Sequence, residues 1–305
     1  MTITELLESV HRVEVRTNRL VNDMMVGAYL SHFKGRGMDF EELREYIPGD
    51  EVRDIDWNVT YRMGRPFVKR YREERELAMI LAVDVSASSA FGSLRRTKRE
   101  YASEVAGTLA FSAARSSDKV GLLLFTNEVE LFLPPRKGRR HILRVLRELL
   151  FFEPKGKGTS ISAGLAFLNH VLRRRSVVFL LTDFLHSFGN QAGETQRRRD
   201  LLQELGLTNA RHDLVCLHLH DPREAELPAA CLLTVEDAET GEMLELDSSR
   251  LAVRERYARE NAERLAELDQ GFRRAGIDTL RLTTSGTFAP ELQRFFETRR
   301  GRRRG

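Results

Sequence analysis

The sequence predicts an α/β fold in which a mostly parallel β-sheet carries helices on both faces. From residue 77 onward, five short apolar runs alternate with helix-length segments, which is the spacing of βαβ units. Several runs are apolar at every position, as strands buried on both faces are. Acidic residues directly follow two of the runs, at the sheet edge where open α/β folds bind ligands.

The first half of this segment is expected to hold four strands and three helices. The strands are 77–83, 119–125, 129–133 and 177–181. The helices are 94–114, 139–151 and 161–172. A tight turn at Asn127 and Glu128 makes 129–133 an antiparallel edge strand, whereas the other strands are parallel.

The second half continues the alternation but contains an insertion. Its helices are expected at 194–205, 251–275 and 288–296, and its strands at 214–219 and 279–283. Two further short strands, 231–235 and 243–246, form a hairpin that interrupts the alternation. Ser248 or Ser249 is expected to cap the helix that begins at residue 251.

The part before residue 77 is expected to form a small α+β module. Residues 4–31 carry a loosely periodic apolar face typical of a helix, and 67–71 has the pattern of a strand. The stretch 35–64 breaks that period with glycines, Pro48 and many arginines and aspartates, which indicates loops or short strands whose charges pair; a docking surface is the alternative. The expected division is a module at 1–76, an α/β domain at 77–298 with a hairpin insertion at about 229–247, and a basic tail at 299–305.

Five oxygen-bearing residues make the candidate site. Asp84, Ser86 and Ser88 alternate where strand 77–83 ends, Thr159 follows a glycine-punctuated loop, and Asp183 closes strand 177–181. Carboxylate and hydroxyl oxygens suit a hard divalent cation such as Mg²⁺. The alternative is structural: the serines cap the next helix and Asp183 starts a turn.

The order Asp-x-Ser-x-Ser, then Thr, then Asp resembles the metal-ion-dependent adhesion site of von Willebrand factor A domains. This resemblance implies a von Willebrand factor A-like, Rossmann-like domain and a site for Mg²⁺, Mn²⁺ or Ca²⁺ held by the five residues. One position departs from the pattern: Phe184 stands where many A domains have glycine, which puts the shape of the neighbouring loop in doubt.

Several enzyme classes fit poorly, and we expect no catalytic activity. Ser86 stands where a haloacid dehalogenase-type phosphotransferase would need a second carboxylate, and Gly158 stands where a Walker loop needs Ser or Thr. The sequence has neither a dinucleotide glycine fingerprint after the first strand nor a Gly-x-Ser-x-Gly elbow. His218 and His220 with Asp221 could form another metal site, but such a pair is more often structural.

A second resemblance concerns the bacterial family called domain of unknown function 58. It rests on the segments 35–40 (Gly-Arg-Gly-Met-Asp-Phe), 43–57 (beginning Leu-Arg-Glu-Tyr-Ile-Pro-Gly-Asp), 68–75 and 221–228, and spans about residues 27 to 285. Where many members have Ala-Arg after the Asp-Trp element, only Arg62 carries over. The resemblance implies an adaptor that works beside a MoxR-type AAA+ ATPase in the assembly or maturation of a client protein.

Composition favours a folded cytoplasmic protein. With 305 residues, 41% hydrophobic and 31% charged, the chain is long enough to bury one large core. We expect no membrane insertion or secretion, because no apolar run approaches the roughly 20 residues that span a bilayer and the N-terminus lacks a signal pattern. Cys216 and Cys231 are too few and too far apart for a disulfide framework.

The excess of positive charge is concentrated at one end of the sequence. The formal net charge is +4, and five of the 49 Lys and Arg lie in 299–304, which leaves 44 against 45 acidic residues elsewhere. An arginine tail of this kind can bind phosphate backbones without sequence preference. A regulatory nucleic-acid-binding A-domain protein is therefore the alternative function, although a short basic tail more often aids solubility or partner encounter.

The metal site itself points to a protein partner. Hydroxyl ligands carry no charge, so a divalent ion held by three hydroxyls and only two carboxylates keeps an electrophilic face and one open position for an oxygen ligand. We expect an Asp or Glu of a partner protein to fill it, which makes the ion a bridge in a complex. Water-mediated hydrolysis at the same ion is the other possibility, but it would need a positioned general base.

Overall fold

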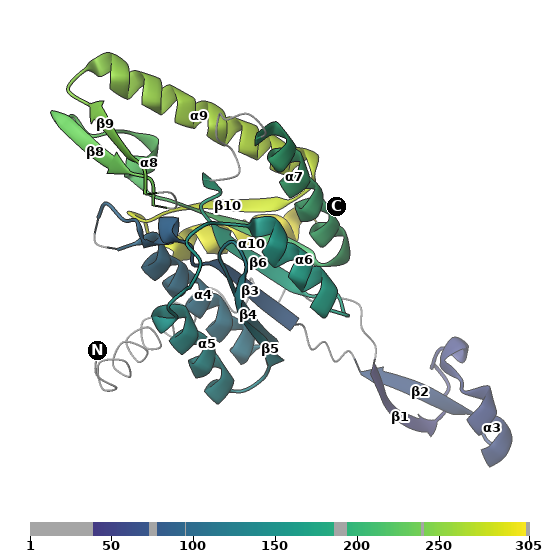
Figure 1. The fold of residues 1–305 in the computed structure, drawn as a ribbon. Coiled ribbons are helices and arrows are strands. Elements are labelled where there is room, and N and C mark those ends of the chain that lie inside the picture. The colour runs from purple at the N-terminus through teal and green to yellow at the C-terminus, as the bar shows by residue number, and fades with distance from the viewer. Residues whose placement is uncertain (1–38, 73–77, 95, 186–193, 239–240, 303–305) are drawn as a thin grey trace. The chain divides into compact units, whose positions relative to one another are not determined.

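The computed structural model describes residues 39–72, 78–94, 96–185, 194–238 and 241–302. The chain divides into two units, Phe33–Glu76 and a larger unit that contains Leu77–Gly305, and each is described by itself (Figure 1). The helix expected at 4–31 lies outside the described residues. Within the described chain, no helix combines the length and apolar character needed to cross a bilayer.

The larger unit is built on a six-stranded sheet in the order β10-β7-β6-β3-β4-β5. Its strands are β3 (Ala78–Asp84), β4 (Lys119–Phe125), β5 (Val129–Arg136), β6 (Val177–Thr182), β7 (Asp213–His220) and β10 (Asp278–Thr283). Every neighbouring pair is parallel except β4 with β5, which is antiparallel. The predicted fold class, including the antiparallel edge strand, is confirmed.

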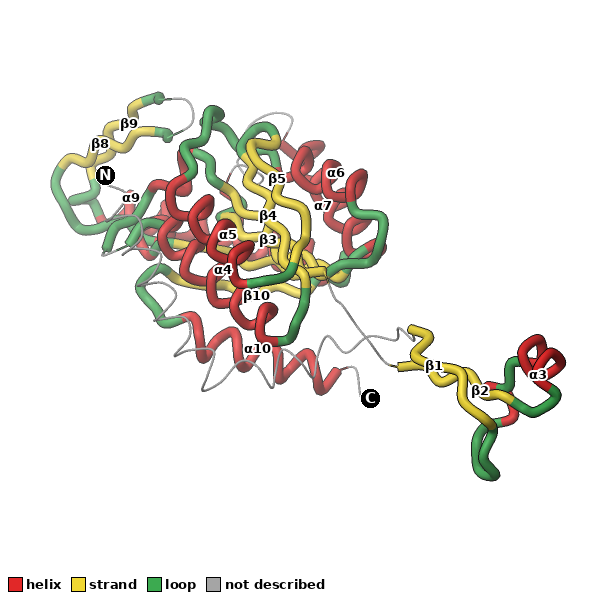
Figure 2. Tube along the Cα trace, turned by 90° about the horizontal axis from the view of Figure 1, so that it is seen from below, coloured by secondary structure: helices red, strands yellow, loops and turns green. Residues whose placement is uncertain are grey.

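Helices cover both faces of this sheet (Figure 2). One face carries α4 (Lys98–Arg115), α5 (Arg139–Phe151) and α10 (Phe288–Arg302); the other carries α6 (Ile161–Val171), α7 (Glu194–Arg211) and α9 (Leu251–Arg274). Because successive strand side chains point to opposite faces, Ile80 of β3 packs in the core beneath α6, α7 and α9. On the other face, Phe179 meets Phe296 of α10 edge to face, with ring centroids 6.2 Å apart.

One helix start and one helix cap differ from the sequence prediction. The helix expected from residue 94 begins at Lys98, because Thr97 and Glu100 form a capping box that fixes the start. Helix α9 begins after Arg250 without a side-chain cap, so the predicted caps Ser248 and Ser249 were wrong. The Ser248 hydroxyl instead donates to the Ala230 carbonyl at 2.7 Å, closing the base of the inserted hairpin.

The inserted hairpin is present and lies beside the start of α9 (Figure 1). It consists of β8 (Leu232–Glu236) paired antiparallel with β9 (Met243–Asp247). A short helix that the sequence prediction missed, α8 (Pro222–Ala225), follows β7 and is capped by Asp221. The Asp-Pro-x-Glu pattern at 221–224 is a capping box with proline at the first helical position, which is the signal that identifies it.

The predicted basic tail at 299–305 was partly wrong, because α10 continues to Arg302. The side chain of Arg299 is only 7% exposed and forms ion pairs with Asp213 at 2.6 Å and with Asp278 at 2.6 Å. These two carboxylates belong to β7 and β10, so Arg299 joins the last helix to the sheet edge. It is a structural residue of the domain and not part of a free tail.

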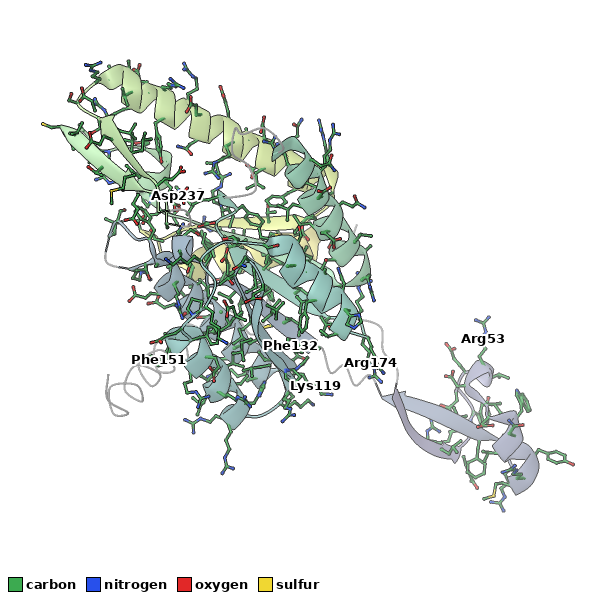
Figure 3. The ribbon with its side chains drawn as sticks, viewed as in Figure 1. Arg53, Lys119, Phe132, Phe151, Arg174 and Asp237 are labelled. Carbon is green, nitrogen blue, oxygen red and sulfur yellow. The ribbon has the colours of Figure 1, made fainter. Side chains whose placement is uncertain are left out.

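The smaller unit is a hairpin followed by helical turns. Strand β1 (Asp39–Glu45) pairs antiparallel with β2 (Phe67–Arg72), and between them lie a 3-10 turn, Val52–Asp54, and helix α3 (Trp57–Met63). Asp56 caps α3 by accepting hydrogen bonds from the Asn58 and Val59 amides. The expected pairing of charges is found between Arg44 and Asp50, 2.6 Å apart, whereas Arg53 is exposed (Figure 3).

Candidate metal centre

The candidate site lies where the chain reverses its direction of travel across the sheet. From β3 the chain moves outward to β4 and β5, then crosses back to β6 on the other side of β3. In open α/β sheets, ligands bind outside the carboxyl ends of the strands at such a point. Asp84 is the last residue of β3, and Asp183 directly follows β6.

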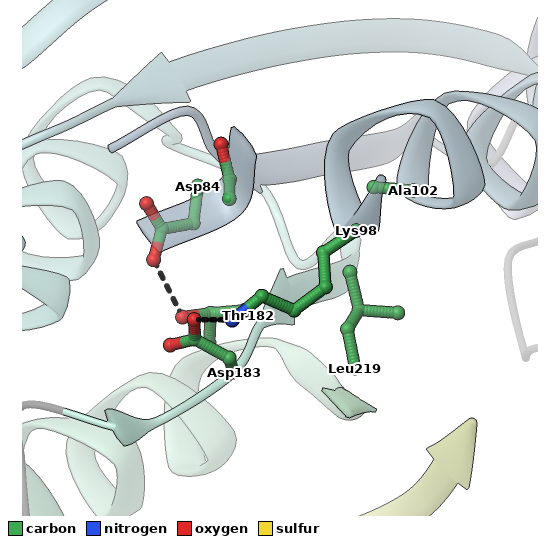
Figure 4. A pocket seen from close by; sticks show the side chains of 7 residues that line it. Asp84, Lys98, Ala102, Thr182, Asp183 and Leu219 are labelled. Carbon is green, nitrogen blue, oxygen red and sulfur yellow. Dashed lines mark hydrogen bonds and ion pairs between the residues drawn. The ribbon is translucent and has the colours of Figure 1, made fainter. Parts of the chain in front are cut away.

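Asp84 is buried and held in one orientation. One carboxylate oxygen accepts the Ser86 amide at 2.9 Å, and the other accepts the Thr182 hydroxyl at 2.7 Å (Figure 4). Burial, and secondarily the negative charge of Asp183, raises the pKa of Asp84 from 3.8 to about 6, although these hydrogen bonds oppose the rise. The site therefore carries more negative charge than its own surroundings stabilise.

The two serine hydroxyls lie together beside this carboxylate. Ser86 Oγ and Ser88 Oγ are 3.1 Å apart, and both side chains are buried. Neighbouring ligands in an octahedral Mg²⁺ shell with bonds of 2.0–2.1 Å are about 3 Å apart, so the spacing fits two adjacent ligands. Ser86 precedes the 3-10 turn Ala87–Ala90 without forming a side-chain cap, which argues against the alternative that it serves only as a cap.

Asp183 forms the predicted turn and lies beside the serine pair. Its Oδ1 accepts the Leu185 amide at 3.1 Å, as a turn-forming aspartate does, and it also accepts a hydrogen bond from Ser88. The next residue, Phe184, has a φ of 54°, in the left-handed region where many A domains place glycine. The ring of Phe184 is buried against Phe272 and His218, and this packing offsets the backbone strain.

The loop that carries Thr159 runs along the Asp84–Ser88 segment. The amide of Ala87, which lies between the two serines in the chain, donates to the Lys157 carbonyl at 2.9 Å, two residues before Thr159. Glu130 anchors the start of the loop by accepting the amides of Lys155 at 3.0 Å and Gly156 at 2.7 Å. A Cβ at Gly156 would lie 2.2 Å from Asn127 Oδ1, so the close approach depends on glycine there.

Lys98 is the residue of the site that sequence reasoning missed. Its side chain is 1% exposed and reaches from the first turn of α4 to Asp183 Oδ2 at 2.5 Å (Figure 4). It also contacts Glu224 of α8. Burial alone would lower the pKa of Lys98, but the charges of Asp183 and Glu224 raise it, so the ammonium is retained. The available signal was a cation in the first turn of a helix, where the dipole favours anions.

The same ion pair sets the charge of Asp183. Burial raises the pKa of Asp183, but the ammonium of Lys98 outweighs burial and holds the pKa below its ordinary value. A cavity of about 10 Å³, room for about one water molecule, lies between Asp84, Lys98, Thr182 and Asp183. Asp84 and Asp183 therefore line the same cavity but differ in how their charge is balanced. Among the described residues, Asp183 forms an ion pair with Lys98, whereas Asp84 accepts hydrogen bonds from uncharged groups.

The donor chemistry fits an oxygen-bound divalent ion. Among the described residues, no group of three or more His, Cys, Asp and Glu is placed to hold a metal, so an ion here would depend on hydroxyl ligands. Ser86 and Ser88 provide such ligands next to Asp84, whose excess negative charge a cation would stabilise. His218 is not part of this set: burial lowers its pKa to about 3, and its ring packs edge to face on Phe184.

Comparisons with known proteins give the relatives of the chain. The family model described as "Protein of unknown function DUF58" matches residues 42–267. Uncharacterized protein Rv1480 of Mycobacterium tuberculosis (strain ATCC 25618 / H37Rv) is 29% identical over 298 residues, covering 97% of this chain and 90% of the relative. Uncharacterized protein MAV169 of Mycobacterium avium is 27% identical over 170 residues, 55% of this chain and 94% of the relative.

Two solved structures are similar at lower identity. The conserved hypothetical protein BatB from Bacteroides thetaiotaomicron is 15% identical with a TM-score of 0.44, covering 73% of this chain and 98% of that chain. The SpRpn10 VWA domain is 10% identical with a TM-score of 0.39, covering 72% and 94%. The sheet order, the antiparallel edge strand and the helices on both faces are those of the mostly parallel α/β fold predicted from the sequence. Because the family model covers most of its length, the chain belongs to the DUF58 family of proteins of unknown function.

Proposed function

We propose that this protein is a metal-ion-dependent adaptor that binds another protein through the site at Asp84. The observation that carries the proposal is the pair of buried hydroxyls, Ser86 and Ser88, 3.1 Å apart beside a buried carboxylate at the switch point of the sheet. Thr159 and Asp183 complete the proposed ligand set, with Asp183 acting directly or through a water molecule.

The balance of charge supports a bound cation. Asp84, Asp183 and Glu224 supply three carboxylates, and Lys98 supplies one buried ammonium. A divalent ion beside Asp84 would offset the unbalanced charge that raises the pKa of that carboxyl. Mg²⁺, Mn²⁺ and Ca²⁺ all accept oxygen ligands, and two hydroxyls 3.1 Å apart can be neighbouring ligands of any of the three.

The ligand types favour binding over catalysis. Hydroxyl ligands leave positive charge on the ion, which then attracts an Asp or Glu from a partner protein. Both oxygens of Asp84 accept hydrogen bonds, and Asp183 is bound to Lys98. Each carboxylate therefore already makes interactions that hold the site together. A metal-assisted hydrolase would instead need a base directed at a water molecule.

Family membership supports a MoxR-type AAA+ ATPase, or its client, as the partner. The DUF58 match includes the smaller unit and most of the larger one, which is consistent with a shared role for both in the complex. The alternative of nucleic-acid binding through the basic tail is weaker than the sequence suggested, because Arg299 is ion-paired inside the domain.

The test is co-purification with the ATPase in the presence of Mg²⁺ or of a chelator. We expect capture by the wild-type protein in Mg²⁺, and loss of capture in chelator and in Asp84→Ala. Asp200→Ala, on the exposed side of α7, is the matched control and should bind as the wild type does. Capture that persists in a folded Asp84→Ala variant and in chelator would refute the proposal. Binding to RNA or DNA that is lost on truncation after Arg302 would favour the alternative.

A further inference from the structure

Lys98 occupies an unusual position for a lysine. It is the first residue of α4, where the partial positive charge of the helix end disfavours a cation, and its side chain is 1% exposed. A lysine side chain also loses considerable rotamer freedom on burial. These costs are offset mainly by its two carboxylate partners, Asp183 and Glu224, and in part by the ring of Phe91, whose centroid lies 5.9 Å from the ammonium.

The ammonium lies close to the position proposed for the divalent ion. It is bonded to Asp183, which in turn accepts a hydrogen bond from Ser88, one of the two paired hydroxyls. Lys98 also borders the small cavity that Asp84 lines. A divalent ion at the serine hydroxyls would therefore be repelled by Lys98 in a buried environment, where charges are weakly screened.

We propose that Lys98 is a built-in competitor of the divalent cation, which keeps metal affinity low until an anionic partner adds its charge. The inference depends on the proposed metal site. Without metal, the ammonium neutralises Asp183 and keeps the site folded. With metal alone, the two cations share one group of carboxylates. An acidic side chain from a partner adds negative charge beside both cations, so metal and partner bind together more tightly than either does alone.

A purely structural ion pair predicts the opposite effect of removing Lys98. If Lys98 only supports the fold of the site, its loss disorders Asp183 and weakens metal binding. If it competes with the metal, its loss strengthens metal binding even though the metal-free protein becomes less stable. Glu224 gives a second test of the direction in which metal affinity changes. Removing its negative charge leaves the Lys98 ammonium less neutralised, which should weaken metal binding.

The experiment measures the dissociation constant of Mn²⁺ at pH 7.5 from the electron paramagnetic resonance signal of free Mn²⁺. The proteins are the wild type, Lys98→Met, Glu224→Gln and the double variant. Lys137→Met is the control. Lys137 is exposed, and it follows β5, whose C-terminal end lies at the opposite end of the strands from Asp84. Thermal unfolding in chelator and in Mn²⁺ provides a second readout.

We expect Lys98→Met to bind Mn²⁺ at least tenfold more tightly than the wild type, Glu224→Gln to bind more weakly, and the double variant to lie between Lys98→Met and the wild type. Lys98→Met should have a lower melting temperature than the wild type in chelator, but its melting temperature should rise more than that of the wild type when Mn²⁺ is added. If Lys98→Met does not fold, the double variant shows whether removing Lys98 strengthens or weakens Mn²⁺ binding. Mn²⁺ binding by folded Lys98→Met, or by the double variant, that is equal to or weaker than that of the wild type would overturn the inference alone. Absence of Mn²⁺ binding in every protein, including the wild type, would overturn the proposed function as well.

Discussion

Replacing Asp84 with asparagine should stabilise the metal-free protein while removing its metal site. The pKa of Asp84 rises from 3.8 to about 6 on folding, chiefly through burial, so its charged form is disfavoured in the folded state. A rise of one in pKa corresponds to about 1.4 kcal/mol, so the ionised Asp84 lowers the free energy of unfolding by about 3 kcal/mol at pH 7. Asparagine carries no charge but offers one acceptor oxygen instead of two, which costs about 1 kcal/mol.

The expected net gain for Asp84→Asn is therefore about 2 kcal/mol in the free energy of unfolding at pH 7.5. A gain of this size raises the melting temperature of a domain this large by about 4–8 °C. The advantage should grow between pH 4 and pH 6 and disappear below about pH 4, because the wild-type carboxyl is then protonated in both folded and unfolded states.

Urea denaturation in chelator at pH 4.5 and pH 7.5 measures this effect. Asp200→Asn on the exposed side of α7 should change the free energy of unfolding by less than about 0.5 kcal/mol. If Asp84→Asn is folded but no more stable than the wild type at pH 7.5, the buried carboxylate does not destabilise the metal-free protein and the reasoning is refuted.

Three further substitutions test the rest of the site and fold. Glu130→Gln should cost about 1 kcal/mol at pH 7 and weaken Mn²⁺ binding in the same titration, because its carboxylate anchors the loop that carries Thr159. Arg299→Met should cost about 3 kcal/mol in urea denaturation by leaving two aspartates without their cation, whereas the exposed Arg294→Met should cost less than about 0.5 kcal/mol. Asp221→Asn should cost about 2 kcal/mol at pH 7, and the cost should begin to fall below about pH 4 and vanish only below the lowered pKa of the folded state: burial raises the pKa of Asp221, but hydrogen bonds from Ser93, Arg223 and Thr284 outweigh it.

The sheet and the ligand cluster could be predicted because both depend on local pattern. Fully apolar runs such as 177–181 form buried parallel strands with little dependence on distant residues. Once β3 and β6 are parallel neighbours, their carboxyl ends meet, and residues after both strands converge. This is why Asp84 and Asp183 could be paired from sequence although they are far apart in the chain.

The roles of Lys98 and Arg299 could not be predicted because they depend on long-range partners. Both are cations in segments whose pattern suggests a solvent-exposed position, and although a lysine is unusual in the first turn of a helix, neither position indicates which distant carboxylates the side chain contacts. Lys98 finds Asp183 and Glu224 on later elements, and Arg299 finds carboxylates on β7 and β10. Only the three-dimensional arrangement brings these charges into contact.

The most direct test of the metal site is a crystal structure of the protein grown with Mn²⁺, with anomalous diffraction used to locate the ion. The proposed function predicts one strong anomalous peak at about 2.1–2.2 Å from Ser86 Oγ and Ser88 Oγ, with Asp84 in its coordination shell directly or through water. A well-ordered site without a peak, with Lys98 still bonded to Asp183 at saturating Mn²⁺, would contradict it.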